Sequence, residues 1–131
     1  MGLAERRLAE SIKSNELPAF QNKINEIAGY EIKIEVDWDT FTSFDETPLN
    51  RLTSVMFESV EFIIKSICID EMGKEALKEK LNTIHLINTD DFDAIKMELK
   101  DKNFYLTFQL AAYSYGSLPD SEILKYIENQ L

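Results

Sequence analysis

Ten consecutive residues alternate between apolar and charged side chains from Tyr30 to Asp39. Successive side chains of a β-strand point to opposite faces, so this segment predicts a strand with one apolar and one charged face. Such a strand packs on one side only, which is typical of antiparallel sheets. A parallel strand covered on both faces would not carry five charges, so the pattern favours an antiparallel arrangement.

Three more strands are predicted in the second half of the chain. They cover Thr83–Asn88, Ala94–Lys100 and Phe104–Tyr113. The last two alternate apolar and polar residues on either side of Asp101-Lys102-Asn103, a pattern that indicates a tight hairpin turn.

Apolar residues spaced by three and four predict helices in the remaining segments. The first runs over residues 8–28, is kinked or restarted at Pro18 and stops at Gly29. The second begins at Thr47-Pro48 and continues to about Cys68; its wide apolar arc predicts the central helix. A third starts at Asp70, and a last one follows Asp120. Residues 40–47 are predicted to form a polar loop.

These elements predict an α+β fold in one domain over residues 1–131, in the order α-β-α-α-β-β-β-α. Strands cluster instead of alternating with helices, which favours α+β over a doubly wound sheet. We therefore expect a mostly antiparallel four-stranded sheet with helices packed on one face. The open face would carry Glu31, Glu35, Asp37, Lys96, Glu98, Tyr105, Thr107, Gln109, Tyr113 and His85.

The 131-residue chain carries a formal net charge of −10, which disfavours contact with nucleic acid or an anionic membrane surface and permits a basic protein partner. A lone cysteine excludes an internal disulfide framework, and no apolar run approaches the ~20 residues of a membrane span. We expect a soluble, cytoplasmic protein.

Few residues are suited to chemistry. The chain has one histidine, His85, one cysteine, Cys68, and four isolated glycines, so no nucleophile–base pair or phosphate-binding loop can be assembled. Asp37-Trp38-Asp39 could hold a divalent metal, but the charged side of any amphipathic strand has the same spacing. His85 could act as a base if a carboxylate oriented it, yet its apolar neighbours favour a structural role. We predict no catalytic residue, metal or cofactor.

The charge is concentrated in one segment. Residues 30–48 contain six acids and one lysine, a net charge of −5 that is half of the total. Acids beside aromatic side chains can steer and anchor a basic partner. Our leading hypothesis is a non-enzymatic protein-interaction domain, similar in size and charge alone to bacterial immunity and inhibitor proteins. The candidate binding residues are Asp37, Trp38, Asp39, Phe41, Phe44 and Asp45, with Tyr105 and Tyr113 on the open sheet face.

Two other functions are compatible with the sequence. One is a small-ligand-binding or enzymatic domain with a pocket between sheet and helices, lined by Trp38, Phe41, Tyr113 and His85. The other is a homodimer that buries the open sheet face.

Overall fold

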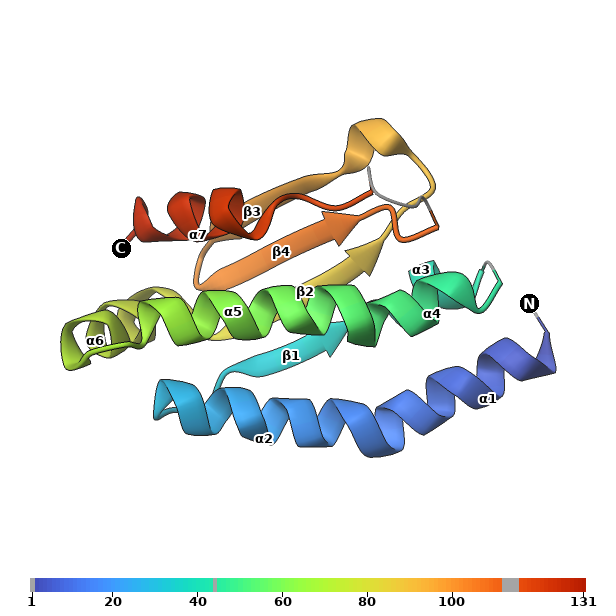
Figure 1. Ribbon diagram of the computed structural model, residues 1–131, viewed down its shortest axis with the longest axis horizontal. Helices are drawn as coiled ribbons and strands as arrows, with labels where there is room; N and C mark the ends of the chain where they lie inside the picture. Colours follow the sequence, from blue (N-terminus) through green and yellow to red (C-terminus); the bar gives the residue numbers. More distant parts are fainter. Residues whose placement is uncertain (1, 44, 112–115) are drawn as a thin grey trace.

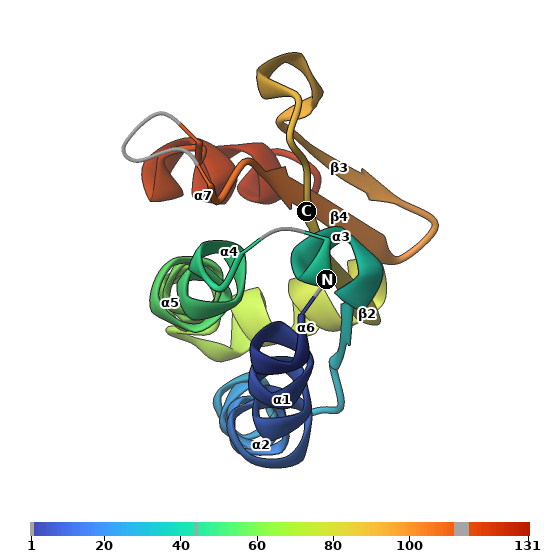
Figure 2. The ribbon, with the colours of Figure 1, turned by 90° about the vertical axis from the view of Figure 1, so that its right-hand side faces the viewer.

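The structure is a computed structural model that describes residues 2–43, 45–111 and 116–131. It contains a four-stranded sheet with helices α2, α5 and α7 on one face (Figures 1 and 2). The strands are β1 (Lys33–Val36), β2 (Thr83–Asn88), β3 (Lys96–Lys100) and β4 (Asn103–Phe108). The α-helices are α1 (Leu3–Ser11), α2 (Leu17–Ala28), α3 (Trp38–Thr42), α4 (Thr47–Arg51), α5 (Phe57–Ile67), α6 (Glu71–Lys80) and α7 (Asp120–Glu128). Three further helical segments are not α-helical: η1 (Ile12–Glu16) and η2 (Leu52–Met56) are π-helical, and η3 (Phe92–Ala94) is 3₁₀.

The α+β class is confirmed, but the expected mostly antiparallel sheet is wrong. The strand order is β1-β2-β4-β3, with β1, β2 and β4 mutually parallel and only β3 antiparallel, to β4. Strand β4 lies between β2 and β3 in the sheet, although β3 precedes β4 in the chain. After β2 the chain first forms the edge strand β3, and the hairpin then returns it as β4 into the space between β2 and β3. The sheet is mixed and mostly parallel.

Charge explains which strands lie at the edges. The edge strands carry the charged side chains of the open face, Lys33 and Glu35 on β1 and Lys96, Glu98 and Lys100 on β3. The central strands β2 and β4 contain no Asp, Glu, Lys or Arg. Charged side chains are tolerated at sheet edges, where they also discourage pairing with other chains. The alternation along β1 therefore correctly indicated that only one face of the strand is buried. It did not indicate whether β1 pairs in parallel or antiparallel.

Helix α5 lies between α2 and α7 across the covered face of the sheet (Figure 1). It continues without interruption from α4 and η2, so the long helix predicted from Thr47 to about Cys68 is confirmed. Its Val60, Ile63 and Ile64 are buried against the sheet residues Ile84 and Phe104. Burial of such aliphatic side chains contributes about 1.5–3 kcal/mol each, and this layer is the core of the fold.

The predicted hairpin is confirmed. Asp101 and Lys102 have φ of 52° and 68°, and they join Lys100 to Asn103 as a two-residue turn. Positive φ at both positions matches the right-handed twist of the flanking strands. Strand β4 ends at Phe108 and not at Tyr113, and residues 112 and 113 lie outside the described residues.

Two helical predictions need correction. The first helix does not restart at Pro18: α1, η1 and α2 follow one another without a break, and the π turn η1 ends at Glu16, two residues before the proline. A π turn accommodates the lost N–H and the ring clash that proline causes within a helix. The strand predicted from Tyr30 to Asp39 is shorter, Lys33–Val36, and residues 38–42 form helix α3 instead of the end of that strand and a loop. Gly29, with φ of 79°, ends α2 as predicted.

Side chains from two helices cap the edges of the sheet. Asn25 of α2 accepts a hydrogen bond from Ile32 N at 2.8 Å, and Gln21 accepts one from Ile34 N at 2.7 Å and donates to the Ile32 carbonyl. At the other edge, the Tyr126 hydroxyl accepts from Leu99 N at 3.0 Å. Unpaired strand edges invite association with other chains, so these caps keep β1 and part of β3 from pairing further.

Candidate protein-binding surface

A buried asparagine joins helix α3 to the ends of two parallel strands. Asn88, 2% exposed, donates from Nδ2 to the Thr40 carbonyl at 2.9 Å and accepts from Leu110 N at 2.9 Å. Its own N–H donates to Thr40 Oγ1 at 3.0 Å. Buried polar groups of this kind are costly unless they are satisfied, so Asn88 fixes where α3 lies. Sequence analysis missed Asn88, although it occupies an inward position after Ile84 and Leu86.

Helix α3 and the ends of its flanking segments present a set of exposed carboxylates, which we call the acidic ridge. Each of the five side chains is exposed, and none forms one of the ion pairs found among the described residues. The acidic ridge consists of Glu35, Asp37, Asp39, Asp45 and Glu46. Uncompensated exposed charge of one sign produces a potential that steers oppositely charged partners. The ridge lies at the end of the molecule where α3 and α4 are found (Figure 1).

The aromatic residues of this segment are less available than their sequence positions suggested. Phe41 is fully buried in the core and offers no side-chain surface to a partner. Trp38 is half-buried, with the Lys13 ammonium 5.1 Å from its ring centroid. A cation over an indole at a partly exposed site contributes on the order of 0.5–1 kcal/mol. Phe44 lies outside the described residues, as does Tyr113 of the predicted open face.

The open face of the sheet brings Tyr105 close to the acidic segment. The strand register places four side chains in one row across the sheet, from β1 through β2 and β4 to β3. The row is Glu35, His85, Tyr105 and Glu98. The acidic ridge therefore adjoins, through Glu35, the aromatic rings of His85 and Tyr105 at the centre of the open face. The sequence already predicted Glu35 and Tyr105 on one open face, and the register adds that they lie in the same row.

His85 and Tyr105 stack at the centre of this row. Their ring centroids are 4.4 Å apart with an interplanar angle of 11°. The His85 Nε2 atom lies 2.9 Å from Asn103 Oδ1, which holds the imidazole in place. Both rings remain partly exposed. The open face thus has aromatic and polar residues at its centre and charged residues on its edge strands, the arrangement found at protein–protein contacts.

Two of the residues expected to line a pocket, Phe41 and His85, lie in different parts of the structure, and Tyr113 lies outside the described residues. His85 lies on the open face, whereas Phe41 belongs to the buried core. A hollow between α5 and the sheet, lined by Val60, Ile84 and Phe104 among others, has a volume of about 10 Å³. Ligand pockets typically have volumes of about 300–1,000 Å³, so this hollow is a packing gap.

Two further findings bear on chemistry and membranes. Cys68 is buried, and burial raises the pKa of its thiol, which opposes formation of the reactive thiolate. Within residues 2–43, 45–111 and 116–131, no three His, Cys, Asp or Glu side chains are grouped closely enough to hold a metal ion. Over the same ranges, no helix is both long and apolar enough to cross a membrane.

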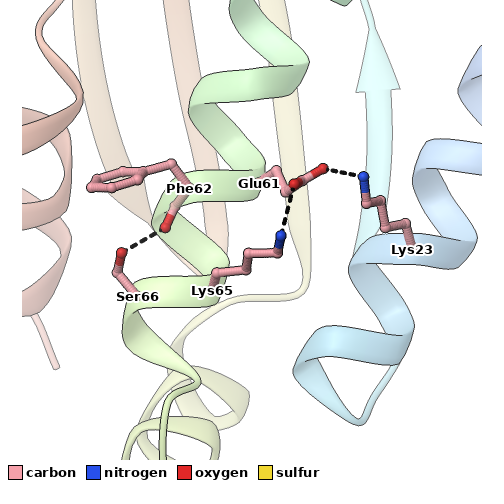
Figure 3. Close-up of polar contacts among 5 residues, drawn as sticks. All are labelled: Lys23, Glu61, Phe62, Lys65 and Ser66. Atoms are coloured by element: carbon pink, nitrogen blue, oxygen red, sulfur yellow. Dashed lines mark hydrogen bonds and ion pairs between the residues drawn. The ribbon is translucent and has the colours of Figure 1, made fainter.

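The shortest ion pair among the residues that the structure describes joins two helices and is structural. Glu61 of α5 contacts Lys23 of α2 at 2.6 Å and Lys65 at 3.0 Å (Figure 3). The hydrogen bond from Lys23 and then that from Lys65 hold the pKa of the Glu61 carboxyl below its ordinary value. The same contact raises the pKa of Lys23. These charges are compensated on the protein itself, unlike those of the acidic ridge.

Comparisons with protein-family models, with curated proteins and with solved structures find no match to this chain. A function has to be inferred from the geometry of its own residues.

Proposed function

We propose that this protein is a non-enzymatic interaction domain that binds a basic protein through the acidic ridge and the adjoining open face of the sheet. The observation that carries the proposal is the continuity of the two surfaces. Glu35 belongs both to the acidic ridge and to the row that contains His85 and Tyr105. Charge at one side then steers the partner, and the stacked rings supply the contact area.

The physical chemistry of the surface supports a protein partner over a small ligand. Exposed carboxylates that lack ion pairs attract a basic surface over distances of about a Debye length, ~8 Å at physiological salt. Tyrosine contributes contact area with little loss of side-chain entropy on binding. Both rings stand on paired strands of the sheet, which present the partner with a preformed surface.

Affinity capture from native cells with the wild-type protein and a D39K/D45K variant tests the proposal. We expect one basic protein to be captured by the wild type and lost with the variant. In stopped-flow measurements with that partner, the variant should associate at least about tenfold more slowly at low salt. The difference should shrink as salt rises, because exposed charges are screened.

A matched control reverses two exposed acids away from the ridge. Glu26 and Glu79 lie in the last turns of α2 and α6, where lysine suits the helix dipole, so E26K/E79K should fold normally. This control has the same net charge as D39K/D45K. Equal loss of the partner in both variants would mean that net charge alone governs binding, and would contradict the proposed surface.

A further inference from the structure

A second surface, distant from the acidic ridge, lies where α5 turns into α6. Two large apolar side chains are almost fully in solvent there: Ile69 is 83% exposed and Met72 is 80% exposed. Both line a groove of about 390 Å³. Its other lining residues are Ser66, Ile67, Asp70, Gly73, Ala76, Glu128 and Leu131. Adjacent exposed apolar side chains at a groove mark a contact site more often than isolated ones do.

The apolar surface continues along α5. Phe62 is 46% exposed, and Ser66, one turn later, donates a hydrogen bond to its carbonyl at 2.7 Å. Figure 3 shows the Phe62 ring on the side of α5 away from Lys23 and pointing toward α7. Phe62 and Ser66 lie one turn apart on α5, and Ile69 follows in the turn after the helix ends at Ile67.

The charge around the groove is negative. Asp70 and Glu128 line it, and no basic residue does. Two lysines flank lining residues in the sequence, and both are already paired, Lys65 with Glu61 at 3.0 Å and Lys74 with Glu71 at 3.7 Å. A second copy of this chain would bring the same acids to the contact and a net charge of −10, which opposes self-association.

We propose that this groove docks an amphipathic helix of another protein, apolar on one side and flanked by lysine or arginine. A helix presents apolar residues along one side at i, i+4 and i+7, which suits the exposed apolar side chains of Ile69 and Met72 in the groove and of Phe62 beside it. The basic flanks meet Asp70 and Glu128. The groove and the acidic ridge lie at opposite ends of the molecule, near α6 and near α3 respectively (Figure 1).

A fluorescent peptide of about 15 residues, with leucine at these spacings and lysine on its flanks, tests the proposal by anisotropy at about 0.15 M salt. We expect saturable binding to the wild type. I69S/M72S should weaken binding at least about tenfold, because it removes the apolar contact. Phe92, 58% exposed on η3, provides a matched control, and F92S should bind normally. Circular dichroism verifies that each variant is folded.

Several results would overturn the proposal. These are no binding up to about 1 mM peptide, equal binding of a scrambled peptide, or equal binding of a peptide with glutamate in place of lysine. Binding that falls in D39K/D45K and not in I69S/M72S would place the peptide on the acidic ridge. A wild type that dimerises in sedimentation, while I69S/M72S is monomeric, would make a second copy the occupant.

Discussion

His85 and Tyr105 stack face to face on neighbouring strands of the open sheet face, with ring centroids 4.4 Å apart. The parallel register of β2 and β4 places them directly opposite each other. The Oδ1 atom of Asn103 lies 2.9 Å from Nε2 of His85 and holds the imidazole in place. A partner would therefore meet two rings whose positions are already set, which lowers the entropy lost on binding.

Replacement of Tyr105 by alanine should separate the stability of this stack from its role in binding. Loss of the aromatic pair is expected to cost about 0.5–1.5 kcal/mol in urea unfolding, in addition to the apolar burial that the half-buried ring loses. If the open face contacts the partner, dissociation should also become faster, as measured by biolayer interferometry. Y105F keeps the ring and should change neither quantity. Unchanged dissociation in Y105A would remove the open face from the binding surface.

Replacement of Asn88 by alanine should destabilise the fold by about 2–3 kcal/mol, because it leaves Leu110 N and the Thr40 carbonyl without their partner. Chemical denaturation measures this loss. Asn82 is exposed, so N82A serves as the control and should stay within about 0.5 kcal/mol of the wild type. A similar small change in N88A would show that Asn88 does not hold α3 on the sheet.

The amide caps on β1 can be removed together. Q21A/N25A leaves the Ile32 and Ile34 N–H groups unpaired at the sheet edge and should cost about 2 kcal/mol of stability. The freed edge should also increase aggregation, visible as light scattering on heating. Asn22, exposed on the same helix, provides the control N22A. Equal scattering from the two variants would argue against edge protection.

The pairing of Glu61 should appear in the pH dependence of stability. Its pKa in the folded protein lies below the unfolded value of about 4.3, so the pair stabilises the fold above about pH 5. That contribution is lost as pH falls through the folded pKa. The wild type should therefore exceed E61Q in urea midpoint at pH 7 and approach it near pH 3. E79Q, which removes an exposed acid, should show no such convergence.

The hairpin turn offers a stabilising substitution. Lys102 has φ of 68°, a conformation that glycine adopts without strain. K102G is expected to raise the free energy of unfolding by up to about 1 kcal/mol, whereas K102V should lower it by a similar amount. K100G, within β3, should be destabilising instead. Urea unfolding measures the free energy of all three variants. A loss of stability in K102G as large as that in K100G would mean that the general cost of glycine outweighs the relief of strain at the turn.

Much of the local structure could be predicted because its causes lie within a few residues of each other. The alternation around Ile34 predicted a strand with one buried face, and the apolar spacing from Leu49 to Ile67 predicted the long helix. Gly29 indicated where a helix ends. The turn at Asp101-Lys102 was likewise local. Of the candidate surface, the sequence indicated the concentrated acids and the outward side of Tyr105, which also follow from local periodicity.

What only the tertiary structure decided involves partners far apart in the chain. Period-two alternation determines which side chains face the core, but pairing direction depends on the path of the connections, so β1, β2 and β4 proved parallel. Asn88 and Phe41 are buried because α3 folds onto the strand ends, which no short pattern encodes. Glu35 lies 50 residues from His85 in sequence, and only the sheet register makes them neighbours.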